Sequence, residues 1–314
     1  MIIPKPNLFS SALLYQAASS SQYLKNDYSN TQFVFCVAVP GCGKTFTGDY
    51  LSLEHNYSHI DGDEPLRTCR RKDITWNFMK AYQLYVEPND EDGPEHLWQP
   101  YMAEIAMQAL DAADTSDKVV LTFAAFRQSF REYVINTWID CGVPPENITL
   151  LQLTIDIDVK LNSLYHRLKR DHEAVGSSIE KYLKAYGWNG EGELACDEFI
   201  QYVKETNLMR WGEGNACWEE IPSDYKYLKT VDVSGRDIIC LDTIDEALNI
   251  PGERSCKSSF GNIRDEIKSI DDKRSELYAE TLPFLVQLRK DAIALSKGEN
   301  VDETKYLQST TITY

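Results

Sequence analysis

The sequence of 314 residues lacks the marks of several protein classes. No stretch of 18 apolar residues occurs, and the N-terminus has no basic segment leading into a long apolar run, so we expect neither a membrane span nor a secretion signal. Its eight cysteines include no C-x-x-C pair, which argues against a zinc site or a disulfide framework. We therefore expect a soluble, cytoplasmic protein with reduced thiols.

Positive charge is also scarce. The chain has 32 Lys and Arg against 49 Asp and Glu, which gives a net charge of −17. Because nucleic acids and anionic membranes are bound by an excess of Lys and Arg, we expect no general nucleic-acid binding and no membrane binding. Any phosphate chemistry must use a local cluster of cations. With 43% hydrophobic residues the chain can bury a full core, and its length predicts one large domain or a domain with a substantial appendage.

The most informative stretch runs from Phe33 to Thr45, FVFCVAVPGCGKT. A β-prone apolar run enters a glycine turn and then a helix start, which fits the P-loop pattern with Ala38 in the first small position. Glycines let backbone N–H groups turn toward a phosphate, Lys44 reaches the β- and γ-phosphates, and the Thr45 hydroxyl can ligate Mg²⁺. The predicted nucleotide-binding residues of this loop are Pro40, Gly41, Cys42, Gly43, Lys44, Thr45 and Phe46.

Two carboxylates follow the second predicted strand, Tyr57 to Ile60, in the order Asp61-Gly62-Asp63. Ligands of parallel α/β sheets bind at the carboxyl ends of the strands, beside the phosphate loop. Asp and Gly also favour plain turns. Because the pair follows a phosphate loop, we favour a functional role over a plain turn. One carboxylate would then serve a metal and the other a substrate hydroxyl.

Two later helices carry clustered cations. Arg127 and Arg131 follow the predicted strand Lys118 to Phe126 and share a helix face, either toward a substrate or as ordinary surface cations. The predicted helix Val159 to Arg170 either closes over the γ-phosphate or places cations to suit the dipole at its C-terminus. Its basic residues are Lys160, His166, Arg167, Lys169 and Arg170.

The alternation of strand and helix predicts an α/β fold of three layers around a parallel five-stranded sheet. We expect a lead-in at residues 1–32 with a short helix near Ser11 to Tyr23, and a P-loop domain at 33–250. An enlarged lid insertion is expected at about 171–220, and a helical extension at 251–314. The extension is predicted to be an appended hairpin or a contact between copies of the chain.

Five segments resemble, in order, the small sugar-acid kinases of the gluconokinase and shikimate kinase group, with the gluconokinase branch the nearer. The resemblance covers roughly Phe33 to Leu248. The segments are FVFCVAVPGCGKT, HIDGDEPLR, KVVLTFAAFRQSFREYV, RLKRD and TVDVSGRDIICLDTIDEAL.

This resemblance implies ATP and Mg²⁺ as cofactors and a small-molecule acceptor. Lys44 would stabilise the transferring phosphoryl group, Thr45 and Asp61 would serve Mg²⁺, and Asp63 would meet the accepting hydroxyl. The remaining implied roles are a substrate side formed by Arg127 and Arg131, lid arginines Arg167 and Arg170, and an adenine-side loop with Ser234 and Arg236.

We therefore expect an ATP-dependent kinase of a sugar acid or a similar small hydroxylated acid. One alternative is a nucleotide or nucleoside kinase of the same fold, in which Arg67, Arg70 and Arg71 bind a substrate phosphate. A polynucleotide end-kinase fits less well because the chain is acidic. The other alternative is a non-catalytic P-loop binding protein whose C-terminal helices are its working surface.

Overall fold

A computed structural model describes residues 27–85, 93–174, 176–184, 188–206, 218–251 and 259–307. Side chains within these ranges are described except at positions 171, 174 and 182. The helix predicted near Ser11 to Tyr23 lies outside the described residues, as does the end of the chain after Leu307.

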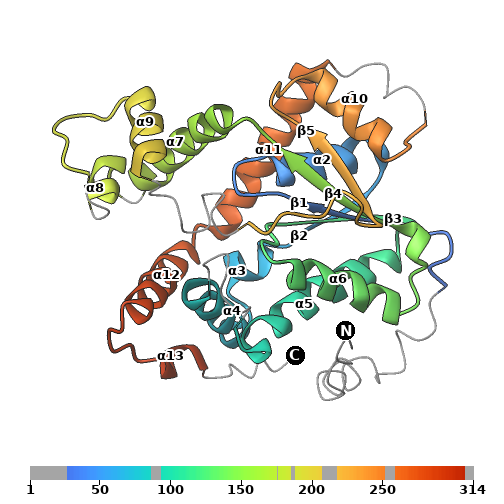
Figure 1. Ribbon diagram of the computed structural model, residues 1–314, viewed down its shortest axis with the longest axis horizontal. Coiled ribbons are helices and arrows are strands. Elements are labelled where there is room, and N and C mark those ends of the chain that lie inside the picture. The colour runs from blue at the N-terminus through green and yellow to red at the C-terminus, as the bar shows by residue number, and fades with distance from the viewer. Residues whose placement is uncertain are drawn as a thin grey trace.

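Five parallel strands form one sheet in the order β2-β3-β1-β4-β5 (Figure 1). This confirms the predicted parallel α/β fold with a phosphate loop after the first strand. The sheet places the carboxyl ends of all the strands at one edge, where such folds bind ligands. The strands are β1 (Gln32–Val37), β2 (Ser58–Asp61), β3 (Lys118–Phe123), β4 (Ile148–Thr154) and β5 (Leu228–Asp232).

Helices fill the connections and extend beyond the sheet. Those between the strands are α2 (Lys44–His55), α3 (Glu64–Thr68), α4 (Lys72–Leu84), α5 (Glu95–Ala113), α6 (Gln128–Asp140), the short 3-10 helix η2 (Pro145–Asn147), α7 (Ile157–Ala174), α8 (Ile179–Lys184) and α9 (Cys196–Thr206). Those after the sheet are α10 (Ile238–Ala247), α11 (Phe260–Tyr278), α12 (Leu282–Ser296) and α13 (Thr304–Leu307).

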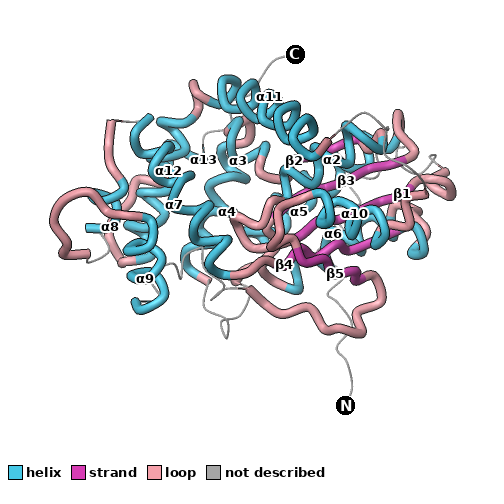
Figure 2. The backbone as a smooth tube through the Cα atoms, turned by 90° about the horizontal axis from the view of Figure 1, so that it is seen from above, coloured by secondary structure: helices cyan, strands magenta, loops and turns pink. Residues whose placement is uncertain are grey.

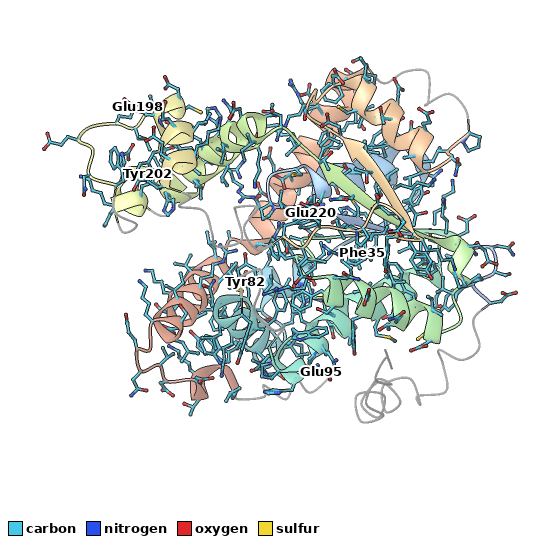
Figure 3. All side chains as sticks on the ribbon, viewed as in Figure 1. Phe35, Tyr82, Glu95, Glu198, Tyr202 and Glu220 are labelled. Carbon is cyan, nitrogen blue, oxygen red and sulfur yellow. The ribbon has the colours of Figure 1, made fainter. Side chains whose placement is uncertain are left out.

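The central strand β1 is apolar because both of its faces are buried. Phe33 and Phe35 pack into a core with α4, α5 and α6, whereas Val34 and Cys36 pack into a second core with α2, α10 and α11. Alternating side chains thus supply two different cores, as expected for a buried parallel strand. Figure 3 labels Phe35 within this packing. The two cores establish the three-layer arrangement.

An arm formed by α7, α8 and α9 extends away from the sheet. It has its own apolar core, which includes Leu164, Leu183 and Phe199. Figure 2 shows the strands gathered at one end of the molecule and this arm at the other, and Figure 3 labels Glu198 and Tyr202 on it. The sequence pattern predicts a helix at Val159 to Arg170 and another at Ala195 to Leu208, which correspond to α7 and α9, but it does not predict the short helix α8.

The C-terminal helices pack onto the α/β domain. Trp76 of α4 stacks on Tyr306 of α13 with ring centroids 4.3 Å apart, and Leu288 of α12 lies in the same cluster. Ile263 and Ile267 bury one face of α11 in the core shared with α2. Contact between copies of the chain through these helices stays a prediction. Among the residues that the structure describes, none of the helices is both long and apolar enough to span a membrane.

One predicted boundary was wrong for a clear reason. The sequence pattern predicts a short helix over Asp242 to Leu248 before the extension, but α10 starts at Ile238. The Asp237 side chain accepts hydrogen bonds from the amides of Ile239 and Cys240, at 3.0 and 3.1 Å. This N-cap satisfies free amides of the first turn and sets the earlier start.

Candidate active site

The phosphate loop joins β1 to α2 and contains two glycines in a conformation that side chains disfavour. Gly41 has φ 89° and Gly43 has φ 85°. Gly43 is the N-cap of α2 and supplies no side-chain cap. The first amides of a helix have no intrahelical acceptor, so here they remain for an external anion. The local backbone therefore fits a phosphate.

Lys44 is the first residue of α2 and is buried. Its Nζ donates a hydrogen bond to the Val39 carbonyl at 3.2 Å. Burial lowers the pKa of the Lys44 ammonium, the charge of Arg167 lowers it further, and the charge of Asp63 raises it. Lys44 thus lies within electrostatic range of Asp63 and of Arg167 on α7.

Two further cations contact the loop. Arg236 Nη2 donates to the Gly41 carbonyl at 2.9 Å. Lys160 is buried, and its Cγ would lie 3.5 Å from a Cβ added at Gly41. Burial raises the pKa of the Cys42 thiol, whereas Lys44, Lys160 and Arg236 each lower it. Positive charge therefore surrounds the loop within an acidic chain.

Sequence reasoning named Lys160 only as one of several cations on its helix. The available signal was its place in the first turn after β4, because β4 is the strand beside β1. Arg236 was predicted near the nucleotide, and the structure brings it to the loop. Ser234 joins the segments after β4 and β5, since its Oγ accepts from the Asp156 amide at 2.7 Å, and its role toward a nucleotide stays a prediction.

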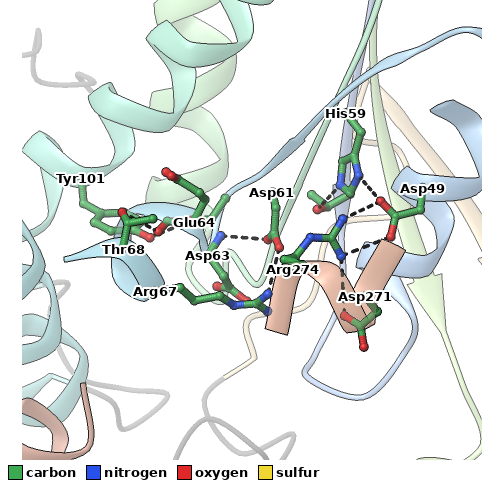
Figure 4. Close-up of polar contacts among 12 residues, drawn as sticks. Asp49, His59, Asp61, Asp63, Glu64, Arg67, Thr68, Tyr101, Asp271 and Arg274 are labelled. Atoms are coloured by element: carbon green, nitrogen blue, oxygen red, sulfur yellow. Dashed lines mark hydrogen bonds and ion pairs between the residues drawn. The ribbon is translucent and has the colours of Figure 1, made fainter. Parts of the chain in front are cut away.

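The carboxylate pair lies where β2 ends and α3 begins (Figure 4). The Asp63 amide donates to Asp61 Oδ1 at 3.1 Å. Arg67 reaches both carboxylates, with Nη1 3.2 Å from Asp61 Oδ2 and Nη2 3.7 Å from Asp63 Oδ2. Partial burial and the charge of Asp61 raise the pKa of the Asp63 carboxyl, while Arg67, Lys44 and Arg289 oppose this.

Asp61 fits a hard cation. Its side chain is only 9% exposed. Within the described part of the chain its Oδ2 accepts no hydrogen bond, since the nearby Arg67 Nη1 lies outside hydrogen-bond geometry. The described residues contain no group of three or more metal-ligating His, Cys, Asp or Glu. A magnesium ion here would thus take oxygen from Asp61 and Thr45 and complete its shell with phosphate and water.

The structure places Arg127 and Arg131 in a buried network at the turn after β3. Arg127 Nη1 pairs with Glu219 Oε1 at 2.8 Å, and its Nη2 donates to the Tyr85 carbonyl at 2.6 Å. Arg131 Nη2 donates to the Glu219 carbonyl at 2.8 Å, and its guanidinium stacks 4.9 Å from the Trp218 ring centroid. Both side chains therefore attach the segment around Glu219 to the start of α6. Their role toward a substrate stays a prediction.

The remaining predicted residues lie on α7 and at the start of α2. Arg167 is half-buried on α7 and its charge reaches Lys44, whereas Arg170 is exposed further along the helix. Thr45 and Phe46 are half-buried at the start of α2, and the Phe46 and Phe260 ring centroids lie 6.3 Å apart. Phe46 thus packs toward α11 within the protein.

Sequence reasoning assigned no C-terminal residue to the site, yet the structure brings several there. The Tyr278 ring lies under Arg67, with the guanidinium carbon 5.6 Å from the ring centroid. Thr281 donates a hydrogen bond to the Arg67 carbonyl. The charge of Arg289 on α12 acts on Asp63. No short motif signals these contacts, because they join residues more than 200 positions apart.

Comparisons with known proteins give similarity to solved structures only. Neither the protein-family models nor the curated proteins contain a match. A gluconokinase from Sinorhizobium meliloti 1021 is 15% identical over 78% of this chain and 98% of its own, with a TM-score of 0.38. A sugar kinase from Janibacter sp. HTCC2649 is 15% identical over 70% and 93%, with a TM-score of 0.37. A shikimate kinase from Bacteroides thetaiotaomicron is 16% identical over 70% and 99%, with a TM-score of 0.34. The fold and the site described above stand on this chain's own strand order and contacts.

Proposed function

We propose that the chain is an ATP-dependent small-molecule kinase that transfers the γ-phosphate of ATP to a hydroxyl of a sugar acid or a similar small hydroxylated acid. The observation that supports this best is the meeting of the phosphate loop and the carboxylate pair at one edge of the sheet. β1 and β2 are separated by β3 alone, so the two sites are two strand spacings apart, roughly 10 Å. Lys44 and Asp63 affect each other's pKa across this gap.

The proposed roles follow from charge and position. The loop amides and Lys44 hold the phosphates, while Lys160, Arg236 and Arg167 neutralise charge around them. The acceptor oxygen forms a bond to the γ-phosphorus as the bond to the ADP oxygen breaks, and Asp63 takes the hydroxyl proton. An upward-shifted pKa suits this proton acceptor, because a base works best with a pKa nearer the working pH. Phosphoryl transfer depends mainly on such positioning and charge neutralisation.

A magnesium ion held by Thr45 and Asp61 would supply positive charge to the phosphate oxygens. Its proposed ligands are hydroxyl and carboxylate oxygens, the donors that Mg²⁺ prefers. Arg170 and Phe46 remain proposed nucleotide contacts, as do Pro40, Cys42 and Ser234.

The basic run that begins in α3 bears on the choice of acceptor. Arg67 is paired with Asp61 and Asp63, Arg70 lies 3.8 Å from Glu64, and Arg71 lies 3.2 Å from Asp73. Each of the three guanidinium groups therefore has a carboxylate neighbour, which would compete with a substrate phosphate. The same competition applies to the carboxylate of a small hydroxylated acid, so an acceptor panel has to decide between that proposal and a nucleotide acceptor.

The test is a panel of acceptors scored by ADP release from MgATP. We expect turnover with sugar acids or related hydroxylated acids and none with nucleoside monophosphates. The reverse pattern would favour a nucleotide kinase. If no acceptor in the panel causes ADP release although MgATP binds tightly, the result would favour a non-catalytic binding protein.

Asp63→Asn provides the residue-level test. It keeps the size of the side chain but removes the proton acceptor, so turnover should fall by roughly 100-fold or more with little change in MgATP affinity. Asp73→Asn is the matched control, because Asp73 is a paired surface carboxylate on α4. Equal loss of turnover and affinity in Asp63→Asn would remove it from the acceptor role.

A further inference from the structure

One helix of the C-terminal extension contacts both halves of the proposed site. Arg274 of α11 binds Asp49 on α2, the helix that starts at the phosphate loop. Tyr278, four residues later on α11, lies under Arg67 on α3, the helix that starts at the carboxylate pair. Residues four apart share a helix face, so a single rigid face spans the two elements. Figure 4 shows α11 crossing beside Asp61, Arg67 and Asp49.

The α2 end of this contact is buried and tightly bonded. Arg274 Nη2 lies 2.7 Å from Asp49 Oδ1, and its Nη1 lies 3.2 Å from Oδ2. His59 Nδ1 bonds the same Asp49 carboxylate at 2.8 Å, and its Nε2 bonds Thr122 Oγ1 at 2.9 Å. Because His59 is on β2 and Thr122 on β3, α11 is linked to the strands as well as to α2.

The α3 end holds Arg67 from two sides. The Tyr278 ring of α11 faces its guanidinium, and the hydroxyl of Thr281, the N-cap of α12, bonds its backbone carbonyl. On its other side the guanidinium reaches Asp61 and Asp63. Arg67 therefore joins the C-terminal extension directly to the two carboxylates.

We propose that α11 fixes the carboxylate pair relative to the phosphate loop, and that Arg67 is the positioning residue through which it acts. The inference rests on the proposed function, which makes Asp61 and Asp63 parts of a phosphoryl-transfer site. Transfer needs the reacting groups held within a few tenths of an ångström, and a misplacement of about 1 Å can cost roughly 100-fold in rate. A helix anchored at both elements supplies that constraint.

The first test is hydrogen exchange in the full chain, which needs no turnover. Tyr278→Ala removes the ring under Arg67, Tyr278→Phe keeps it, and Leu277→Ala is the matched control because Leu277 is 70% exposed on the same helix. The reporters are the α3 amides of Arg67 and Cys69, which bond the Asp63 and Pro65 carbonyls. We expect faster exchange of both amides in Tyr278→Ala, and wild-type exchange in Tyr278→Phe and Leu277→Ala.

The second test separates positioning from folding by kinetics. With the acceptor that the panel identifies, Tyr278→Ala should lower kcat by about tenfold and leave the KM for MgATP within about twofold. Tyr278→Phe should restore kcat. Arg67→Lys keeps the charge but cannot reach Asp61 and Asp63 with two nitrogens at once. It should therefore also lower kcat and leave the KM for MgATP nearly unchanged.

The outcomes distinguish this inference from the proposed function. If Tyr278→Ala matches Leu277→Ala in exchange and in kcat, the inference is overturned and the proposed function is untouched. If kcat and KM change together, Tyr278 has only a general structural role and the inference is again overturned. If the wild-type chain neither binds MgATP nor releases ADP, the proposed function itself fails.

Discussion

Arg274 and Asp49 form a two-point ion pair between helices 225 residues apart in sequence, with Nη2 to Oδ1 at 2.7 Å and Nη1 to Oδ2 at 3.2 Å. The Asp49 side chain is 5% exposed and that of Arg274 is 14% exposed. Removing one partner of a buried pair leaves the other charge poorly solvated. This pair is therefore a sensitive point of attachment for the C-terminal extension.

Asp49→Asn should lower the free energy of unfolding by about 3 kcal/mol, because the mostly buried Arg274 loses its close counter-charge and keeps the more exposed Asp271 at 3.6 Å. The measurement is urea unfolding of the full chain. Arg71→Ala is the control, since its pair with Asp73 is largely exposed and should contribute less than ~1 kcal/mol. Equal losses in the two variants would show that α11 is not held by this pair.

The same pair predicts a pH dependence. Burial opposes ionisation of Asp49, but hydrogen bonds and charge from His59 and Arg274 outweigh it and hold the pKa of the carboxyl below its usual 3.8. A lowered pKa in the folded state stabilises the protein above the unfolded value, and this stability is lost as the pH falls through the folded value. The stability gap between wild type and Asp49→Asn should thus be full near pH 6 and shrink below pH 3.8. Urea midpoints across this range measure it, and a constant gap would exclude the assigned ion pair.

Gly→Ala variants at two positions allow the cost of backbone strain to be measured apart from the loss of ligand binding. Gly43 and Gly142 have φ of 85° and 98°, and a Cβ added at either meets no atom within 4 Å. Each Gly→Ala change should therefore cost about 1–2 kcal/mol from the left-handed conformation alone. Only Gly43→Ala should also weaken MgATP binding, because only Gly43 is in the phosphate loop. Calorimetry on both variants tests this, and similar affinities would argue against the loop as the binding site.

The buried network after β3 gives a further stability prediction. Glu219 pairs with Arg127 and accepts from the Gln128 amide at 2.6 Å. Glu219→Ala should cost about 3 kcal/mol in unfolding free energy, since the buried Arg127 guanidinium loses the carboxylate 2.8 Å away. The adjacent Glu220 is exposed, so Glu220→Ala should stay within about 0.5 kcal/mol of wild type. Comparable effects would contradict the placement of Glu219.

The sequence predicted those parts of the fold whose signals are local. Phe33 to Val37 is apolar because the strand is buried on both faces, and the glycines after it carry the loop conformation. Both signals lie within a dozen residues, so the pattern alone predicted the loop after β1. The Asp61-Gly62-Asp63 turn at the end of β2 is an equally local signal, and it predicted the carboxylate pair. The short helix α3 was missed because five residues give no helical period to detect.

The contacts that complete the site are long-range and have no comparable signal. Arg274 and Tyr278 read as ordinary residues of a charged helix, and only the packing of α11 brings them to Asp49 and Arg67. Arg127 and Arg131 show the converse. Their spacing predicted a shared face, but the partner of both, Glu219, is about 90 residues away and could not be foreseen.

The central claim is that the loop after β1 binds a nucleoside triphosphate through its backbone amides and Lys44. Titration calorimetry of MgATP into the full chain, beside Lys44→Ala, tests it most directly. The account predicts a dissociation constant between about 1 μM and 1 mM for wild type, and at least tenfold weaker binding for Lys44→Ala. No binding heat from wild type under varied temperature, or equal affinity in the two proteins, would contradict it.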